Sequence, residues 1–104
     1  MTRKRVDANQ SAIFKIFRQM GCTVLNLSNV GGCADALVAI TPIRQPLVEL
    51  KDGSKPPSQR KLTPAEAKFH SKWKGELYII NNEDEAIALV NRIRRECDDF
   101  TMLQ

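Results

Sequence analysis

Apolar residues recur along the chain with the periods of helices and strands. From about Ala8 to Met20 they fall at helical spacing, with Asp7 or Asn9 as the N-cap and Gly21 as the stop. Short aliphatic and β-branched stretches follow and predict three strands, at about residues 22–27, 36–41 and 47–51. The first half of the chain is therefore expected to form one amphipathic helix followed by three strands.

A polar connection and a second helix are expected next. Residues 52–61 combine two prolines with several cations and hold no residue that needs burial, which predicts an exposed loop. Residues 63–66 read Thr-Pro-Ala-Glu, the signature of a capped helix start with proline in its first turn. This helix is expected to run to about Trp73 and to end at Gly75.

The last third of the chain predicts a strand and a third helix. Residues 77–80 are suited to a buried strand, and Asn82 with Glu85 repeats the cap signature. The helix that follows is expected to fray after Arg95 into an acidic tail. The order is αβββαβα, which indicates a single α/β domain over residues 1–104 with a small mixed β-sheet flanked by helices.

Composition limits the classes of protein to which the chain can belong. At 104 residues, with 42% hydrophobic and 27% charged residues, it fits one globular domain of modest core. No apolar run approaches the roughly 20 residues that a membrane helix needs, and no signal peptide follows the basic N-terminus. We expect a cytoplasmic protein that has no membrane partner.

Cysteine and glycine patterns argue against zinc, redox and nucleotide sites. The three cysteines have no short paired spacing, so reduced thiols are expected. Gly31 and Gly32 are not followed by the Gly-Lys-Ser/Thr element of a phosphate-binding loop, so no nucleotide cofactor is expected. The net charge of +4 is compatible with a polyanionic partner.

Charged residues at two strand ends carry the strongest chemical signal. Asp35 stands at the head of the strand at 36–41, and Glu49 and Lys51 stand at the tail of the strand at 47–51. Residues two apart on a strand share a face, and a hairpin partner can bring Asp35 beside them. Two carboxylates suit a hard divalent cation such as Mg²⁺, and a lysine can orient water and offset phosphate charge. The sequence therefore predicts a phosphodiesterase centre.

These residues resemble the motifs of the PD-(D/E)xK nuclease superfamily, and within it the phage and archaeal Holliday-junction resolvases and the VRR-NUC group. The matching segments are residues 32–35, 49–51 and 62–66, and the resemblance covers about residues 5–95. It implies a restriction-endonuclease-like core, with a basic N-terminal arm before it and an acidic tail after it. It also implies Mg²⁺ or Mn²⁺ as cofactor, with Asp35, Glu49 and the Leu50 carbonyl as ligands and Lys51 as the catalytic lysine.

The function that the resemblance implies is a metal-dependent DNA endonuclease of phage type, acting on branched DNA such as Holliday junctions. Symmetric cutting of a four-way junction requires two sites, so a twofold homodimer is expected. For a phage-encoded chain the location would be the host cytoplasm.

One departure from the family pattern concerns the first helix. That helix normally supplies a glutamate, but no glutamate precedes Glu49, and Gln10 occupies the corresponding position. An amide oxygen can coordinate a metal without adding negative charge, which predicts weaker metal affinity or dependence on Mn²⁺. A nuclease-fold protein that binds nucleic acid without cutting it is therefore an alternative. A third interpretation is an interaction module in which Asp35, Glu49 and Lys51 form an ion-pair cluster.

Residues beyond the triad have two interpretations each. Glu66 stands where the VRR-NUC group commonly has a glutamine, with Gln59 as a competitor, but its capping role accounts for it fully. A run of cations after Lys51 is interpreted as a phosphate-contacting rim and alternatively as a solvated surface: Lys55, Arg60, Lys61, Lys68, Lys72 and Lys74. Arg3, Lys4 and Arg5 are a weaker candidate for a DNA-binding arm.

Aromatic residues and the single histidine are interpreted as structural. Core spacing within their elements predicts packing roles, not a base-stacking platform, for Phe14, Phe17, Phe69, Trp73 and Tyr78. His70 is expected to be a surface histidine or one bonded to a partner.

Overall fold

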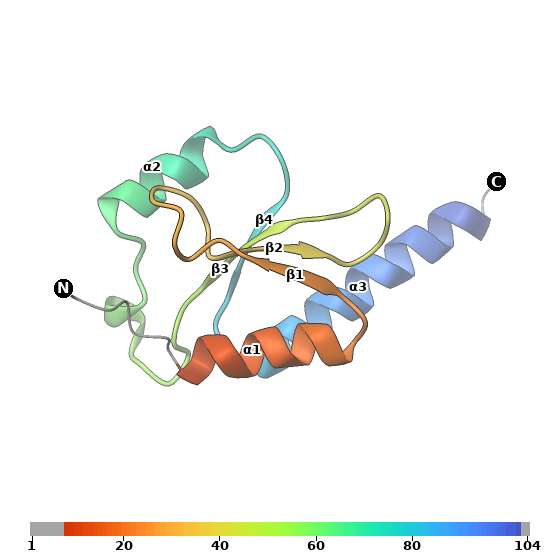
Figure 1. The fold of residues 1–104 in the computed structure, drawn as a ribbon, viewed down its shortest axis with the longest axis horizontal. Helices are drawn as coiled ribbons and strands as arrows, with labels where there is room; N and C mark the ends of the chain where they lie inside the picture. Colours follow the sequence, from red (N-terminus) through yellow and green to blue (C-terminus); the bar gives the residue numbers. More distant parts are fainter. Residues whose placement is uncertain (1–7, 103–104) are drawn as a thin grey trace.

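The computed structural model describes residues 8–102, which form one mixed four-stranded sheet and three α-helices (Figure 1). The elements in chain order are α1 (Ala8–Gln19), β1 (Thr23–Asn26), β2 (Ala36–Ala39), β3 (Leu47–Leu50), the 3₁₀ turn η1 (Pro57–Gln59), α2 (Pro64–Lys72), β4 (Leu77–Ile80) and α3 (Glu83–Met102). The α/β class, the small mixed sheet and the predicted order of elements are thereby confirmed. Within residues 8–102, no helix is both long enough and apolar enough to cross a membrane.

The sheet has the strand order β1-β2-β3-β4. The first three strands pair antiparallel through short connections, while β3 and β4 pair in parallel. A parallel pair needs a crossover, because the chain must return to the starting end of the sheet. Residues 51–76 make that crossover and include α2, so the crossover determines where α2 lies.

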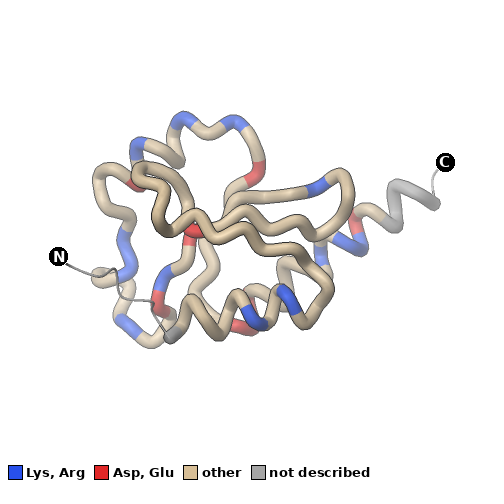
Figure 2. The backbone as a smooth tube through the Cα atoms, viewed as in Figure 1, with Lys and Arg blue, Asp and Glu red and all other residues tan. Residues whose placement is uncertain are grey.

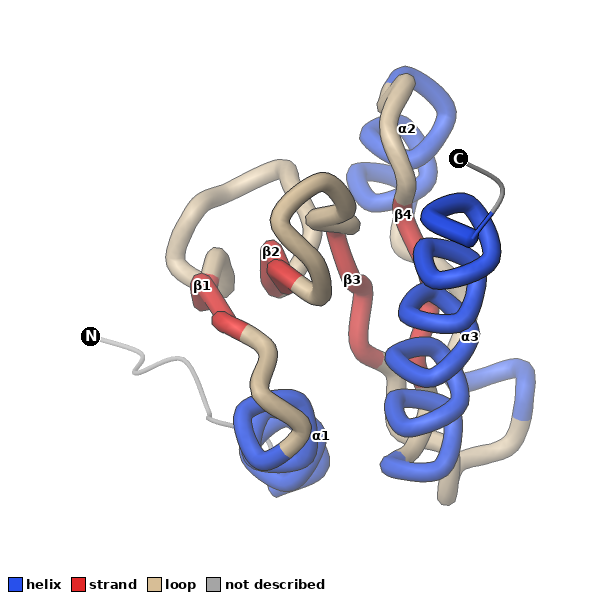
Figure 3. Tube along the Cα trace, turned by 90° about the vertical axis from the view of Figure 1, so that its right-hand side faces the viewer, coloured by secondary structure: helices blue, strands red, loops and turns tan. Residues whose placement is uncertain are grey.

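Alternation along the strands separates two faces of the sheet. One face meets α1 and α3, and Val38 and Val48 from that face pack with Phe17 and Ile93 in the apolar core, each 0% exposed. Glu49 follows Val48 and therefore points to the opposite face. Figure 3 shows α1 and α3 lying against the sheet and α2 lying away from α1.

Local chemistry explains several element ends. Gly21 follows α1 with a φ of 86°, a conformation that glycine adopts without a Cβ penalty, as expected for a helix stop. Thr63 and Glu66 form a complete capping box at the start of α2, with Pro64 in its first turn. At α3 the Glu85 N–H donates to Asn82 Oδ1 at 2.9 Å, so the predicted cap residue is also confirmed.

Some predicted boundaries are wrong. Helix α1 begins at Ala8, so Asn9 lies inside it and is not the N-cap; Asp7, the other candidate, lies outside the described residues. Helix α3 continues to Met102 instead of fraying after Arg95. Contacts with distant residues stabilise the first part of this extension, since Glu96 bonds to Arg44 at 2.7 Å and Cys97 Sγ lies 3.8 Å from Thr41 Oγ1. The loop at 52–61 also contains the short turn η1, which was not expected.

The packing roles predicted for the aromatic residues hold for only part of the set. Phe14 and Phe17 are buried in the core, as predicted. Trp73 is 43% exposed, and Phe69 and Tyr78 are only partly buried. None of the described residues of α2 is fully buried, because the helix lies at one end of the sheet and not on the core.

Candidate active site

Asp35 is held against β3 by two main-chain contacts. Its N–H donates to the Val48 carbonyl at 3.1 Å, and its Oδ2 accepts the Leu50 N–H at 2.7 Å. The pairing of β2 with β3 therefore brings the head of one strand beside the tail of the other, as the hairpin argument predicts. The contact observed for Leu50 is through its N–H, and ligation by its carbonyl stays a prediction.

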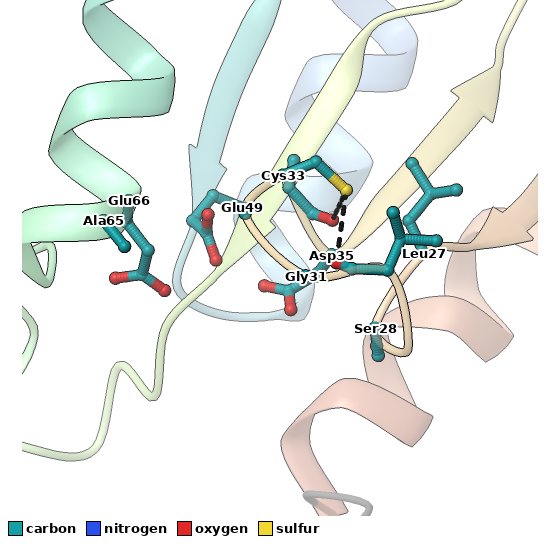
Figure 4. Close-up of a pocket in the computed structure, with 11 residues that line it drawn as sticks. Leu27, Ser28, Gly31, Cys33, Asp35, Glu49, Ala65 and Glu66 are labelled. Atoms are coloured by element: carbon teal, nitrogen blue, oxygen red, sulfur yellow. Dashed lines mark hydrogen bonds between the residues drawn. The ribbon is translucent and has the colours of Figure 1, made fainter.

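A cavity of about 180 Å³ opens where these strands meet α2. Three carboxylate side chains line it, from Asp35, Glu49 and Glu66, and Figure 4 shows them directed into the same space. The loop between β1 and β2 contributes residues 27–28 and 30–34 to the wall, and α2 contributes Ala65. Cys33 is part of this wall, and its Sγ bonds to the Val30 and Ala34 carbonyls.

Glu49 is the most deeply buried charged residue of the site, at 2% exposure. Its pKa is raised to about 9, first by burial and then by a hydrogen bond to Asp35 and the negative charges of Asp35 and Glu66. Lys51 opposes the shift only in part. The site therefore disfavours the negatively charged form of Glu49.

Lys51 and Glu66 form an ion pair across the cavity edge. Lys51 Nζ lies 2.7 Å from Glu66 Oε1, and the two side chains are 14% and 25% exposed. The same Oε1 accepts the Thr63 N–H at 2.8 Å. Burial alone would raise the pKa of Glu66, but the hydrogen bonds from Lys51 and Thr63 lower it. The predicted capping role is correct yet incomplete, because Glu66 also contacts the candidate catalytic lysine.

His70 is a site residue that the sequence interpretation missed. Its Nε2 lies 3.3 Å from Glu49 Oε1, and its side chain is 15% exposed. The expected bond to a partner is present, but that partner is one of the two candidate metal ligands. His70 stands four residues after Glu66 in α2, a spacing that places both on one side of the helix. That spacing is the signal by which the sequence could have revealed it.

Two amide side chains at the start of α1 form hydrogen bonds with residues of the site. Asn9 Nδ2 donates to the Lys51 carbonyl at 2.8 Å. Gln10 Nε2 donates to Ser28 Oγ at 2.9 Å, and Ser28 lines the cavity while Gln10 does not. Gln10 therefore supports the wall of the cavity, and a direct role at a metal stays a prediction.

Asp35 and Glu49 are the residues of the cavity that could hold a divalent cation such as Mg²⁺ or Mn²⁺. Among the described side chains, no group of three or more His, Cys, Asp or Glu residues is arranged to hold an ion. Mg²⁺ commonly takes one or two carboxylates and completes its shell with water and substrate phosphate. Asp35 and Glu49 fit that requirement, since both are carboxylates in one open cavity.

Basic residues surround this end of the molecule. Figure 2 shows lysine and arginine positions along α2 and the connection that leads to it, with acidic positions at the end of the sheet. Most of the predicted rim is exposed, namely Lys55, Lys61, Lys68, Lys72 and Lys74. Arg60 is partly buried, and its Nε has no hydrogen-bond partner among the described residues. The candidate arm at residues 3–5 lies outside the described residues.

Comparison with known proteins adds no relative: no family model matches the chain, and neither a curated protein nor a solved structure is found to be similar to it.

Proposed function

We propose that the protein is a divalent-metal-dependent DNA endonuclease of the PD-(D/E)xK type. The observation that carries the proposal is the pairing of Asp35 with Glu49 in one cavity, where burial and mutual repulsion raise the pKa of Glu49 to about 9. A strongly perturbed carboxylate in a cleft is typical of a functional site. A divalent cation would relieve the repulsion, and the surrounding lysines suit a phosphate substrate.

Each residue of the site has a distinct role in this proposal. Asp35 and Glu49 would hold Mg²⁺ or Mn²⁺, which lowers the pKa of water and polarises the phosphoryl oxygen. Lys51 orients the attacking water and offsets charge on the phosphate. His70 keeps the Glu49 carboxyl in place through the contact between Nε2 and Oε1. Water adds to phosphorus, one P–O ester bond breaks, and the departing oxygen takes up a proton.

Lys51 must exchange partners for this role. Its Nζ forms an ion pair with Glu66, whose carboxylate balances the charge of the ammonium group. A phosphate oxygen competes for the same amine, since lysine ammonium groups bind phosphate as well as carboxylate. The chain thus keeps its lysine ordered at the cavity edge before substrate arrives.

Branched DNA is the substrate proposed for this centre. One site cuts one strand, so symmetric resolution of a four-way junction requires a twofold homodimer. The basic residues of α2 and of the preceding connection would contact phosphates and contribute affinity that falls with salt.

The test is cleavage of a labelled four-way junction, with duplex of the same sequence beside it, in Mg²⁺, in Mn²⁺ and in EDTA. Asp35→Asn and Lys51→Met are expected to lower the rate at least about a hundredfold. Lys15→Ala, an exposed lysine on α1, is the matched control and is expected to cut like the wild type. Cutting that persists in EDTA or in both site variants would reject the proposal.

The alternative is a nuclease-fold protein that binds DNA without cutting it. It is favoured by Gln10, which occupies the position at which the family pattern has a glutamate. The Gln10 amide bonds to Ser28. This alternative requires salt-dependent DNA binding that Asp35→Asn leaves unchanged, together with no cleavage in either metal.

A further inference from the structure

Two aromatic rings, of Phe69 on α2 and of Trp73 directly after that helix, are ordered without being buried in the core. The rings of Phe69 and Trp73 stack with centroids 5.6 Å apart at an interplanar angle of 23°. Trp73 is 43% exposed, yet its Nε1 donates to the Glu76 carbonyl at 3.1 Å. A Cβ at Gly75 would lie 3.0 Å from that nitrogen, so the indole also packs closely on the glycine backbone. Local contacts therefore preorganise the pair at the surface.

Phe69 also lines a second hollow next to the carboxylate cavity. This hollow of about 280 Å³ is bounded by Gly32, Ala65, Lys68, Phe69 and Lys72. Gly32 and Ala65 line the carboxylate cavity as well. The two spaces therefore adjoin, and a chain-like ligand with one group at Asp35 and Glu49 can place its next group against Phe69.

The two spaces differ in charge. The carboxylate cavity is lined by three acids, whereas the residues that bound the second hollow include no acid and two lysines. Lys68 and Lys72 are exposed and stand four residues apart, so they lie on the same face of α2. Phe69 stands between them in the sequence. An aromatic ring with cations nearby is an arrangement by which proteins bind single-stranded nucleic acid, with a base on the ring and phosphates on the cations.

We propose that the hollow beside Phe69 binds an unpaired nucleotide next to the phosphate that is cut. The base stacks on Phe69, and Lys68 and Lys72 contact the flanking phosphates. A base inside a duplex cannot reach a protein ring unless it leaves the stack, which is energetically unfavourable. The inference rests on the proposed function and narrows its substrate class to DNA with unpaired nucleotides at the cleavage point, such as the open centre of a junction, a flap or a single-stranded end.

The test uses Trp73, the only tryptophan of the chain, as a reporter beside Phe69. Labelled oligothymidylate and a hairpin duplex of equal charge are titrated in EDTA, and probe anisotropy and tryptophan emission are recorded together. Oligothymidylate is expected to quench or shift the emission, and the duplex is not. Phe69→Leu removes the ring at similar volume and is expected to weaken oligothymidylate binding about tenfold, with duplex binding unchanged.

Two variants control for folding and for general surface effects. Phe69→Tyr keeps the ring and is expected to keep wild-type affinity. Ile43→Ala trims a side chain that is 77% exposed in the turn between β2 and β3, and it is expected to change nothing. Each variant is compared with the wild type in thermal unfolding, so that a loss of binding is read only from folded protein.

Three results would overturn the inference: wild-type oligothymidylate binding by folded Phe69→Leu, tryptophan emission that stays constant while anisotropy rises, or no binding of oligothymidylate. Failure of the proposed function is a separate result, because the titration contains no metal and is repeated with Asp35→Asn. If oligothymidylate quenches the emission of a protein that never cuts DNA, the nucleotide-binding site is supported and the nuclease function is rejected.

Discussion

Val48 and Glu49 are neighbours on β3, and they are equally buried on opposite faces of the sheet. Val48 is 0% exposed among apolar groups from α1 and α3, and Glu49 is 2% exposed beside Asp35 and His70. Burying an aliphatic side chain stabilises a fold by roughly 1.5–3 kcal/mol, whereas burying a carboxylate without full compensation opposes folding. The same degree of burial therefore stabilises the fold at Val48 and opposes folding at Glu49.

The helices next to the two faces of the sheet also differ in how deeply their residues are buried. The face of Val48 is closed by two amphipathic helices that contribute Phe17 and Ile93 to the core. The face of Glu49 is bordered by α2, in which none of the described residues is fully buried. An open, charged face next to a closed, apolar one is expected where a small domain must admit a polar ligand and still fold.

The largest expected effect comes from placing a carboxylate on the apolar face. Val48→Glu would bury a charge with no cationic or hydrogen-bonding partner and should lower the free energy of unfolding by about 4 kcal/mol or unfold the chain. Leu25→Glu, at a position of β1 that is 55% exposed, is the control and should change it by less than about 0.5 kcal/mol. Urea denaturation measures both, and similar losses in the two variants would erase the distinction between the faces.

The reverse change on the charged face should stabilise the protein. The pKa of Glu49 is raised from 4.5 to about 9, so its favourable contribution is complete below the ordinary pKa and is lost as pH rises toward the folded value. At pH 7 in EDTA, Glu49→Gln is therefore expected to raise the free energy of unfolding by about 2 kcal/mol. Added Mn²⁺ should raise the Tm of the wild type but not of the variant. A less stable variant in EDTA would contradict this account of Glu49.

A smaller effect is expected from His70. His70→Ala removes the group 3.3 Å from Glu49 Oε1 and leaves that carboxyl without the contact, which should destabilise the fold by about 1 kcal/mol. Loss of an orienting partner should also weaken Mn²⁺ binding about tenfold, measured by calorimetry. Ser71→Ala, the exposed neighbour on α2, serves as the control. Unchanged metal affinity in His70→Ala would assign the histidine to packing alone.

The smallest effect is expected at the ion pair of Arg44 and Glu76, in which the two charges balance each other. The hydrogen bond from Arg44 lowers the pKa of Glu76, so this carboxylate stabilises the fold above its ordinary pKa and loses that contribution as pH falls. Glu76→Gln should cost about 0.5–1 kcal/mol at pH 7 and flatten the fall of Tm between about pH 5 and 3. Its pH dependence is thus opposite in sign to that of Glu49, and a Tm profile measures it. An unchanged acid profile would show that the pair contributes nothing to folding.

Much of the fold follows from short-range patterns in the chain. The capping box of Thr63 and Glu66 and the stop at Gly21 depend only on neighbouring residues, and both are present as predicted. The length of α3 could not be predicted in this way. Beyond Arg95, Glu96 and Cys97 contact Arg44 and Thr41, which lie far away in sequence.

The candidate site likewise has residues that short-range patterns predict and residues that depend on long-range packing. Asp35, Glu49 and Lys51 were identifiable because strand alternation and a short hairpin connection bring them together. The Glu66–Lys51 ion pair was not, because the crossover between β3 and β4 decides where α2 lies. The helical spacing of His70 from Glu66 was the one signal for His70, and it does not show that the histidine meets Glu49. Gln10 is a mixed case: its helix was predicted, but its bond to Ser28 depends on how α1 packs against the loop.

By itself the sequence determined the order of the elements and the caps of α2 and α3, and it predicted a shared face for Glu49 and Lys51, because helical and strand periods act over a few residues. Only the tertiary structure decided which side of α2 meets the site and which side meets solvent. Helical spacing sets Phe69 and Trp73 on one side of the helix, but it does not say whether that side meets the core. The path of the parallel crossover decides it, and it leaves Trp73 exposed while bringing His70 to Glu49.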